Sequence, residues 1–177
     1  MKITLKDGSV REYEGGRRVL DIAKDISEGL ARAATSARVN GEIVDLRKEV
    51  SEDCELELLT FDSEDGKGAF WHTTSHIMAQ AVKRLYPETK LAIGPSIDNG
   101  FYYDLDRETP FAAEDLEKIE AEMKKIVKEN LAIERFTRSR EEAIAYFKEN
   151  GEPYKVELVE DLPEGEEISF YRQGEFV

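Results

Sequence analysis

The stretch MKITLKDGSVREYEGGRRVLDIAKDISEGL, residues 1–30, decides the fold of the first part of the chain. Polar and apolar residues alternate over residues 2–13 around the tight-turn pair Asp7-Gly8, a pattern that predicts a β-hairpin. The hydrophobic period then lengthens to that of a helix over residues 19–26, and Gly29 suits the end of this helix. We therefore expect a hairpin followed by one helix.

The residues after this helix predict a small sheet that covers it. Short strands are expected over residues 37–39, 43–46 and 55–61, and Asn40-Gly41 is a second tight-turn pair. A hairpin, a helix and further strands in this order are typical of a β-grasp, a ubiquitin-like sheet folded over one helix. The glycine- and acid-rich run DSEDGKG at residues 62–68 is typical of a linker. The expected division is a first domain at residues 1–62, a linker at 63–68 and a second domain at 69–177.

Residues 69–177 mix helices with strands. Helical periodicity covers residues 69–86, which end at Pro87, and residues 113–130, while Ser139 and Glu142 form a capping box for a helix to Glu149. Strands are expected over residues 91–97, 101–105, 133–137 and 168–172, and residues 154–162 fit either a helix or a strand. The apolar face of the 113–130 helix is formed by Leu116, Ile119, Met123, Ile126 and Val127. The expected fold class is therefore α+β, with a mostly antiparallel sheet packed by helices.

The composition limits the possible classes of function. The chain has 177 residues and a net charge of −14, because 39 Asp and Glu residues outnumber 25 Lys and Arg residues. Such an acidic surface argues against autonomous, non-specific nucleic-acid binding, which depends on clustered basic residues. No apolar run approaches the length of a membrane span, and the N-terminus lacks the apolar core of a signal peptide. Cys54 is the only cysteine, so we expect no disulfide, no membrane and a cytoplasmic location.

The only two histidines, His72 and His76, lie four residues apart and therefore share one face of the 69–86 helix. Six apolar residues form a stripe on about the opposite face of this helix: Phe70, Ile77, Met78, Ala81, Val82 and Leu85. This arrangement argues against a pair of core histidines. Two interpretations remain open, which are a pair of histidines on a solvated face and a functional pair.

A metal-dependent hydrolase is one functional alternative, because two histidines at this spacing can chelate zinc. The zinc-protease motif requires Glu directly after the first histidine, where this chain has Thr73. A third ligand is also needed, and Cys54 lies in a predicted strand whose pattern favours a place in the core. We therefore predict no metal site in this chain.

A second group of candidate residues follows the histidine helix. Gly94-Pro95 and the run DNGFYYD at residues 98–104 fit an ordinary hairpin, or a pocket wall made by backbone and one tyrosine over the histidine helix. Lys155 fits an exposed lysine, or a cation that stabilises an oxyanion or phosphate in a cleft. Ser75 precedes His76 but lacks the Gly-x-Ser-x-Gly setting of a nucleophile. The sequence has no Gly-x-x-x-x-Gly-Lys loop, which argues against a nucleoside triphosphatase.

Five runs of sequence together resemble the N-terminal region of bacterial threonyl-tRNA synthetases. RVNGEIVDL at residues 38–46 is similar to their TGS domain, a β-grasp module. HTTSHIMAQAVKRLYP at residues 72–87, AIGP at 92–95, DNGFYYD at 98–104 and PYKV at 153–156 are similar to their editing domain. The resemblance runs through the whole chain. It implies a TGS domain at residues 1–62 and an editing domain from residue 69 onward.

This resemblance implies a proofreading function in translation, the hydrolysis of seryl-tRNA(Thr) that the synthetase forms in error. Serine is threonine without one methyl group, and a methyl group gives only about 10- to 200-fold discrimination, so a second, hydrolytic site is needed. The family pattern implies catalytic roles for His72, His76 and Lys155 and substrate-binding roles for Tyr103 and Gly94. It does not divide the catalytic roles between the two histidines.

The resemblance also implies cofactors and partners. ATP, magnesium and a core zinc ion serve the aminoacylation core of the family, so no cofactor is expected in this chain. The expected partners are the 3′ end of tRNA(Thr) carrying serine and the rest of the synthetase polypeptide, with a monomeric fragment and a homodimeric parent.

The place where the chain stops leads to a further expectation. It ends at Val177, just after the turn Gln173-Gly174 and before the Cys-x-x-x-His pair of the family, so we expect a fragment whose editing site is incomplete. The alternative to an editing enzyme is a non-catalytic, TGS-containing module in which residues 63–177 only present a surface for tRNA or protein.

Overall fold

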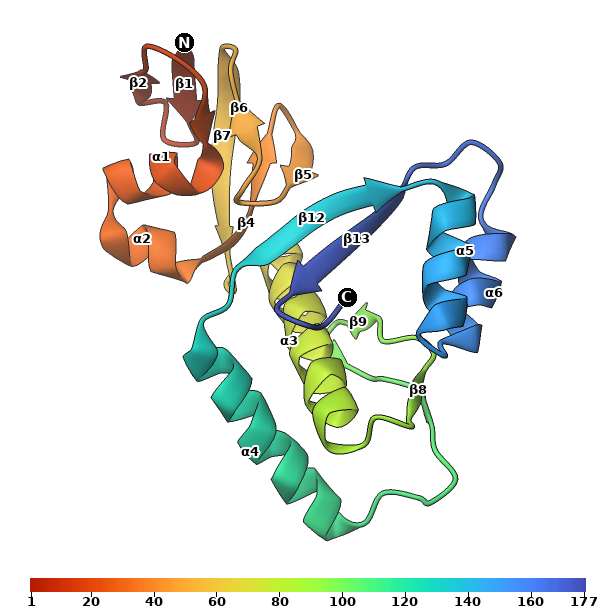
Figure 1. Ribbon diagram of the computed structural model, residues 1–177. Helices are drawn as coiled ribbons and strands as arrows, with labels where there is room; N and C mark the ends of the chain where they lie inside the picture. The colour runs from red at the N-terminus through yellow and green to blue at the C-terminus, as the bar shows by residue number, and fades with distance from the viewer. The chain divides into compact units, whose positions relative to one another are not determined.

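The computed structural model describes residues 1–177, whose helices and strands form two compact units (Figure 1). The first unit comprises residues 1–73 and 96–100, and the second comprises residues 74–95 and 101–177. None of the helices combines the length and the apolar character that a membrane span requires. Each unit is built around its own core, and each is described separately below.

The sheet of the first unit has the strand order of a β-grasp. Its five strands are β1 (Lys2–Leu5), β2 (Val10–Glu12), β4 (Ala34–Val39), β5 (Glu42–Val44) and β7 (Cys54–Thr60), in the order β2-β1-β7-β4-β5. β1 and β7 run parallel, whereas the other neighbours run antiparallel. Positive φ angles of 83° at Gly8 and of 49° and 88° at Asn40 and Gly41 close the two predicted hairpin turns. The predicted β-grasp is therefore confirmed.

Two short helices, instead of the predicted single helix, pack on this sheet. α1 (Val19–Ile26) ends at Ser27, whose Oγ accepts hydrogen bonds from the N–H groups of Gly29 (3.2 Å) and Leu30 (3.3 Å) and so begins α2 (Glu28–Ala33). Gly29 therefore lies inside α2 and does not end a helix. A short strand pair, β3 (Arg17–Arg18) with β6 (Glu49–Val50), is an addition to the predicted elements. The core consists of Ile3, Val19, Ile22, Ala37, Val50 and Leu56.

The residues predicted to form a linker are helical. α3 runs from Glu64 to Leu85, so residues 64–68 form its first turns. Glu64 and Asp65 suit the positive N-terminal end of the helix dipole. Packing requires glycine at position 66, because a Cβ atom there would lie 2.0 Å from the Thr60 carbonyl oxygen. The glycines and acids therefore mark the start of a helix and not a flexible connection.

The second unit contains the rest of α3 and three further helices, α4 (Ala113–Glu129), α5 (Arg140–Glu149) and α6 (Pro153–Asp161). Residues 154–162, which fit either element, are thus mostly helical, with Pro153 in the first turn. β12 (Ile133–Arg138) and β13 (Ile168–Gln173) pair antiparallel. Four two-residue strands replace the two predicted between residues 90 and 106: β8 (Lys90–Leu91), β9 (Ser96–Ile97), β10 (Gly100–Phe101) and β11 (Leu105–Asp106). Of these, β8 and β11 belong to the second unit, whereas β9 and Gly100 of β10 belong to the first. The α+β class with mostly antiparallel pairing is confirmed, although these strands form separate pairs.

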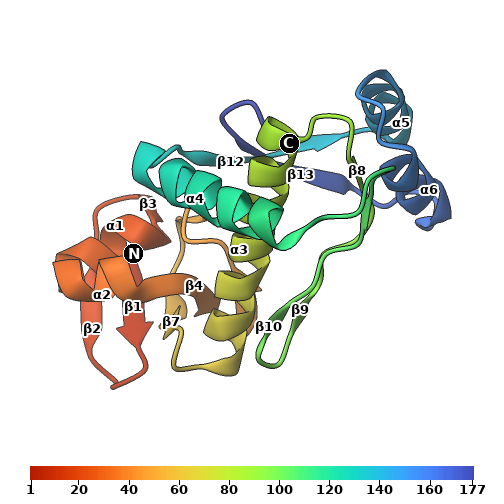
Figure 2. The same cartoon turned by 90° about the horizontal axis from the view of Figure 1, so that it is seen from below.

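The core of the second unit is divided into two clusters. One joins the second half of α3 to α4, which lies beside it (Figure 2), through Ala81, Val82, Ile119 and Ile126. The other joins α5 and α6 to β12 and β13, and its buried members are Ala143, Phe147, Val156, Val159, Ile168 and Phe170.

Three residues predicted to lie on apolar faces are outside these cores. Leu116 and Val127 are each 61% exposed, so the prediction that they face the core is wrong. The buried side chains of α4 contact those of α3, and the stripe that they form is narrower than the sequence pattern suggests. Phe70 contacts Phe61 and Trp71, with ring centroids 5.1 and 5.3 Å away, and is 43% exposed.

Candidate active site

The two histidines lie one turn apart on α3, because a spacing of four residues returns to the same helix face. His76 is half-buried, and its ring meets the edge of the Phe176 ring with centroids 6.5 Å apart. His72 is exposed, and partial desolvation by its surroundings lowers the pKa of its imidazole. A lowered pKa favours the neutral ring, which can accept a proton from water.

Gly94 and Tyr103 are in direct contact. The Tyr103 ring lies so close to Gly94 that a Cβ atom at position 94 would be 2.2 Å from Tyr103 Cδ2. Ser75, which is fully buried on α3, donates a hydrogen bond from Oγ to the Gly94 carbonyl oxygen at 3.1 Å. Burial, together with the charge of Glu152, raises the pKa of Tyr103 to about 12. The phenol therefore stays neutral and forms a fixed wall against the Gly94 backbone.

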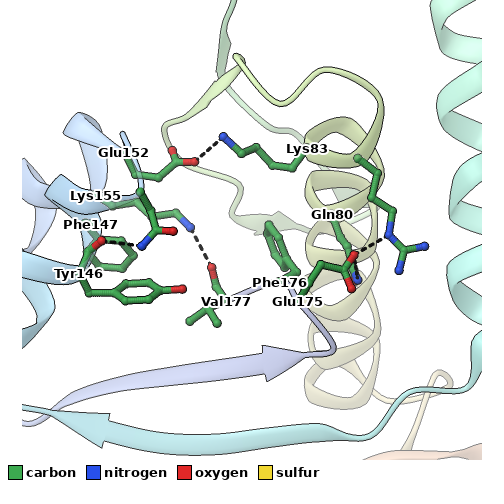
Figure 3. Close-up of a pocket in the computed structure, with 11 residues that line it drawn as sticks. Gln80, Lys83, Tyr146, Phe147, Glu152, Lys155, Glu175, Phe176 and Val177 are labelled. Carbon is green, nitrogen blue, oxygen red and sulfur yellow. Dashed lines mark hydrogen bonds and ion pairs between the residues drawn. The ribbon is translucent and has the colours of Figure 1, made fainter.

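A cavity of about 230 Å³ opens in the second unit among α3, α5, α6 and the turn after β13 (Figure 3). The rings of Phe147 and Phe176 and several charged side chains face it (Figure 3). Its lining consists of Gln80, Lys83, Arg84, Tyr146, Phe147, Asn150, Glu152, Lys155, Glu175, Phe176 and Val177. Such a mixture of aromatic and charged groups can hold a small polar ligand.

Two of the three cations that line the cavity are already neutralised. Lys83 Nζ pairs with Glu152 Oε1 at 2.8 Å and donates to the carbonyl oxygens of Pro87 and Thr89, each at 2.9 Å. Arg84 pairs with three carboxylates, those of Glu122 (3.3 Å), Glu129 (2.7 Å) and Glu175 (2.5 Å). Both groups thus serve mainly to hold elements of the second unit together.

Lys155 is the third cation and is bound more sparsely. Its Nζ donates one hydrogen bond of 3.3 Å, to the Val177 carbonyl oxygen, and lies 5.3 and 5.5 Å from the ring centroids of Phe147 and Phe176. An ammonium group has three N–H donors, so Lys155 has donors left for a ligand in the cavity. Burial lowers its pKa, Glu152 raises it and Lys83 lowers it further. Lys155 is thus a half-buried cation that lines the cavity, and it is not an exposed surface lysine.

The sequence-predicted site residues occupy three places. Lys155 lines the cavity, and His76 meets it through Phe176, which is also part of the lining. Gly94 and Tyr103 form a separate contact with each other. The charge of Glu152 contributes to raising the pKa of Tyr103 and also acts to raise that of Lys155. His72 lies in the part of α3 that belongs to the first unit.

Several residues of the site are absent from the sequence-based prediction. Gln80 Nε2 donates hydrogen bonds of 3.2 Å to the Gln173 carbonyl oxygen and to Glu175 Oε1. Gln80 and Lys83 lie near the histidines on the helical wheel, so their position on the same helix face could have indicated them as site residues. Glu152 and Glu175 gave no such signal, because their positions depend on partners far away in the sequence.

Metal-ligating side chains do not gather around the histidines. No group of three or more His, Cys, Asp or Glu side chains in residues 1–177 is arranged to hold a metal ion. Cys54 is half-buried against the core of the first unit and forms no disulfide. The metal-dependent alternative therefore has no geometric support among these residues.

Comparisons with known proteins agree with the fold. Residues 1–60 match the model of the TGS domain. Over its full 177 residues the chain is 65% identical to the threonine–tRNA ligase of Acetivibrio thermocellus, 62% to that of Caldanaerobacter subterraneus subsp. tengcongensis and 64% to that of Clostridium tetani. The chain spans 28% of the length of each of these ligases. It therefore belongs with the N-terminal regions of threonine–tRNA ligases and contains a TGS domain.

Proposed function

We propose that this chain, as the N-terminal region of a threonine–tRNA ligase, hydrolyses the ester that joins serine to the terminal adenosine of mischarged tRNA(Thr). The similarity to threonine–tRNA ligases supports this proposal, because serine differs from threonine by the loss of one methyl group. Exclusion of a smaller substrate by binding alone is weak, on the order of 10- to 200-fold, and a hydrolytic site corrects the error.

Lys155 is the observation on which the proposal rests. Attack of water on the ester carbonyl places negative charge on the carbonyl oxygen, and a cation aimed at that oxygen stabilises the transition state. Lys155 is the lining cation that is not already paired with a carboxylate or saturated by carbonyl oxygens, and it is held between two aromatic rings. We assign it the role of electrostatic support for the oxyanion.

The histidines and the tyrosine wall are assigned the remaining roles. His76 or His72 positions the attacking water and accepts its proton, which then passes to the ribose oxygen as the ester bond breaks. Gly94 and Tyr103, which contact each other, are assigned the binding of the amino acid side chain, as the resemblance implies. These roles match the types of residue that ester hydrolysis requires.

The proposal extends to partners and cofactors. The chain spans 28% of its relatives' length, so the rest of the ligase is proposed as its covalent partner, with ATP, magnesium and a core zinc ion serving aminoacylation there. The 3′ end of tRNA carrying serine is the proposed substrate, and the cytoplasm is the proposed compartment. A monomeric fragment and a homodimeric full-length ligase remain part of the proposal.

The proposal is tested by hydrolysis of seryl-tRNA in a chimera. This chain replaces its 65% identical counterpart in the Acetivibrio thermocellus ligase, and single-turnover loss of serine is measured. We expect the chimera to hydrolyse seryl-tRNA and expect His76→Ala and His72→Ala each to slow the step by about 10²- to 10⁴-fold. Unchanged rates in both variants would refute the catalytic assignment. Threonine charging by the same samples shows that the variants are folded.

A further inference from the structure

Glu152 is a buried carboxylate for which the proposed hydrolysis gives no role so far. It is 5% exposed and is the one charged residue among the buried residues of the chain. Burial of a carboxylate is costly unless the group is paired and hydrogen-bonded, so such a residue reflects a specific local need. It lies directly before α6, where its carbonyl oxygen accepts the first helical hydrogen bond, from the Val156 N–H at 3.2 Å.

Each carboxylate oxygen of Glu152 has a defined partner. Oε1 pairs with Lys83 Nζ at 2.8 Å, and Oε2 accepts a hydrogen bond of 3.0 Å from the Leu91 N–H. Lys83 in turn donates to the carbonyl oxygens of Pro87 and Thr89. The pair therefore joins the last turn of α3, the segment up to β8 and the start of α6 at one point, as Figure 3 shows for Lys83 and Glu152.

Lys155 stands on the first turn of α6, three residues after Glu152. Any change in the position of this turn moves the Lys155 ammonium relative to the cavity. The Glu152 charge also acts on Lys155, because it counters the effect of burial and keeps the pKa of the ammonium higher. The same charge contributes to the raised pKa of Tyr103, so Glu152 influences two proposed site residues from different segments.

We infer that Glu152, held by Lys83, is a positioning residue of the proposed ester-hydrolysing site. It fixes the first turn of α6 and provides the negative charge that balances the Lys155 ammonium facing the cavity. This inference rests on the proposed function. It assigns Glu152 no contact with substrate, and the effect on hydrolysis that the tests below measure is the one that passes through Lys155.

The charged and titratable groups around Lys155 determine how the inference can be tested. Lys83 and Arg84 face the cavity from α3, Tyr146 from α5, Glu152 from the start of α6 and Glu175 from the turn after β13. Arg84 and Glu175 neutralise one another, so the Lys83–Glu152 pair is the part of this set that a variant can change selectively. Glu152→Gln removes the charge and keeps the shape. The double variant Lys83→Met/Glu152→Gln removes both opposing charges.

The experiment measures the titration of Lys155 in the 177-residue chain. A trace amount of acetic anhydride labels lysines competitively at a series of pH values, and peptide mass spectrometry reports the fraction of Lys155 that is acetylated. We expect Glu152→Gln to shift the titration of Lys155 to lower pH, because the carboxylate that favours the ammonium form is gone. We expect Lys155 of the double variant to titrate at a pH between the values for Glu152→Gln and for the unmodified chain, because loss of the Lys83 charge acts in the opposite direction.

Hydrolysis in the chimera provides the second readout. We expect Glu152→Gln to slow single-turnover loss of serine by roughly ten- to a hundredfold, because a small displacement of Lys155 is enough to weaken its contact with the oxyanion. Glu160→Gln, an exposed change on the same helix, is the matched control and is expected to leave both readouts unchanged.

The outcomes separate this inference from the proposed function. A Glu152→Gln chain that is folded by circular dichroism and has an unshifted Lys155 titration overturns the inference. A chimera that never hydrolyses seryl-tRNA overturns the proposed function, whereas the labelling experiment needs no substrate and still decides whether Glu152 controls Lys155. If Glu152→Gln does not fold, the double variant Lys83→Met/Glu152→Gln tests the inference instead. Titration of Lys155 at a lower pH than in the unmodified chain supports the inference, and titration at the same pH contradicts it.

Discussion

The ion pairs on the sheet of the first unit are more exposed than the most buried ion pair of the second unit. On the sheet of the first unit, Glu57 pairs with Lys6 and with Arg38 (2.8 Å), and Arg38 also pairs with Asp65 (2.5 Å), among side chains that are between 23% and 77% exposed. In the second unit, Glu152 and Lys83 form a pair in which the Glu152 side chain is only 6% exposed. Exposed pairs contribute little to stability, whereas a buried pair cannot lose one partner without a large penalty.

This difference follows from how each unit builds its core. The first unit closes one core between its strands and α1, and the ion pairs on its sheet stay partly exposed. The second unit divides its core into two clusters, and the cavity lies among the elements that carry them. A cavity between two cores can hold charged groups in a fixed geometry, which is the property that a site for ester hydrolysis needs.

The largest expected effect is the loss of one partner of the buried pair. Lys83→Met leaves the Glu152 carboxylate buried without its cation and is expected to lower the free energy of unfolding by about 3–5 kcal/mol. Urea denaturation followed by circular dichroism measures this change. Lys83→Met/Glu152→Gln is expected to recover much of the loss, and Lys124→Met, on the exposed face of α4, is the control. A loss under about 1 kcal/mol for Lys83→Met would contradict a structural role for the pair.

The Gly94–Tyr103 contact is expected to give the next largest effect. Gly94→Ala places a methyl group 2.2 Å from the Tyr103 ring and is expected to cost about 1–3 kcal/mol of stability. Gly94→Ala/Tyr103→Ala is expected to lose less than the sum of the two single changes, because the removed ring leaves room for the methyl group. Thermal denaturation tests this. Gly68→Ala in α3, where a Cβ atom meets no other atom within 4 Å, is expected to be neutral or stabilising.

A double-mutant cycle on Arg38 and Glu57 measures the strength of a partly exposed ion pair of the first unit. We expect a coupling energy below about 1 kcal/mol, because both side chains are partly exposed and Glu57 also pairs with Lys6. The free energies of unfolding of Arg38→Met, Glu57→Gln and the double variant give this energy. A coupling energy as large as the loss of unfolding free energy in Lys83→Met would contradict the difference between the exposed pair of the first unit and the buried pair of the second.

The smallest expected effect is a dependence of stability on pH. Hydrogen bonding and pairing with Arg84 hold the pKa of Glu175 at about 2, below its ordinary value of 4.5. A depressed pKa in the folded state contributes stability above the ordinary value, and this stability is lost as pH falls from about 4.5 to about 2. Glu175→Gln is expected to flatten the fall of the urea midpoint in this range. Glu114→Gln, an exposed change at the start of α4, is expected to leave the fall unchanged.

The sequence predicted well those features that depend on neighbouring residues. Gly8, Asn40 and Gly41 adopt the positive φ angles that their residue types favour, and these turns set the register of two hairpins. The Ser139–Glu142 capping box also forms as predicted, with hydrogen bonds of 3.0 and 3.2 Å. The β-grasp could therefore be predicted from local signals alone.

Features that depend on distant partners could not be predicted in this way. Gly66 belongs to a helix start because its backbone packs against Thr60, and Gly29 lies inside α2 because Ser27 caps that helix. Leu116 and Val127 match the apolar period of α4 but lie beside its narrow buried stripe. In the candidate site, Lys155 could be proposed from the resemblance, whereas Glu152 could not, because its burial depends on Lys83 and Leu91.

In the proposed function, Lys155 supplies the cation for ester hydrolysis in the cavity of the second unit. The most direct test compares single-turnover hydrolysis of seryl-tRNA by the chimera with Lys155, by Lys155→Met and by the control Lys124→Met. We expect Lys155→Met to slow hydrolysis by about 10²- to 10³-fold, while threonine charging by Lys155→Met and hydrolysis by Lys124→Met stay at the unmodified level. Hydrolysis by Lys155→Met at the unmodified rate would contradict this role of Lys155.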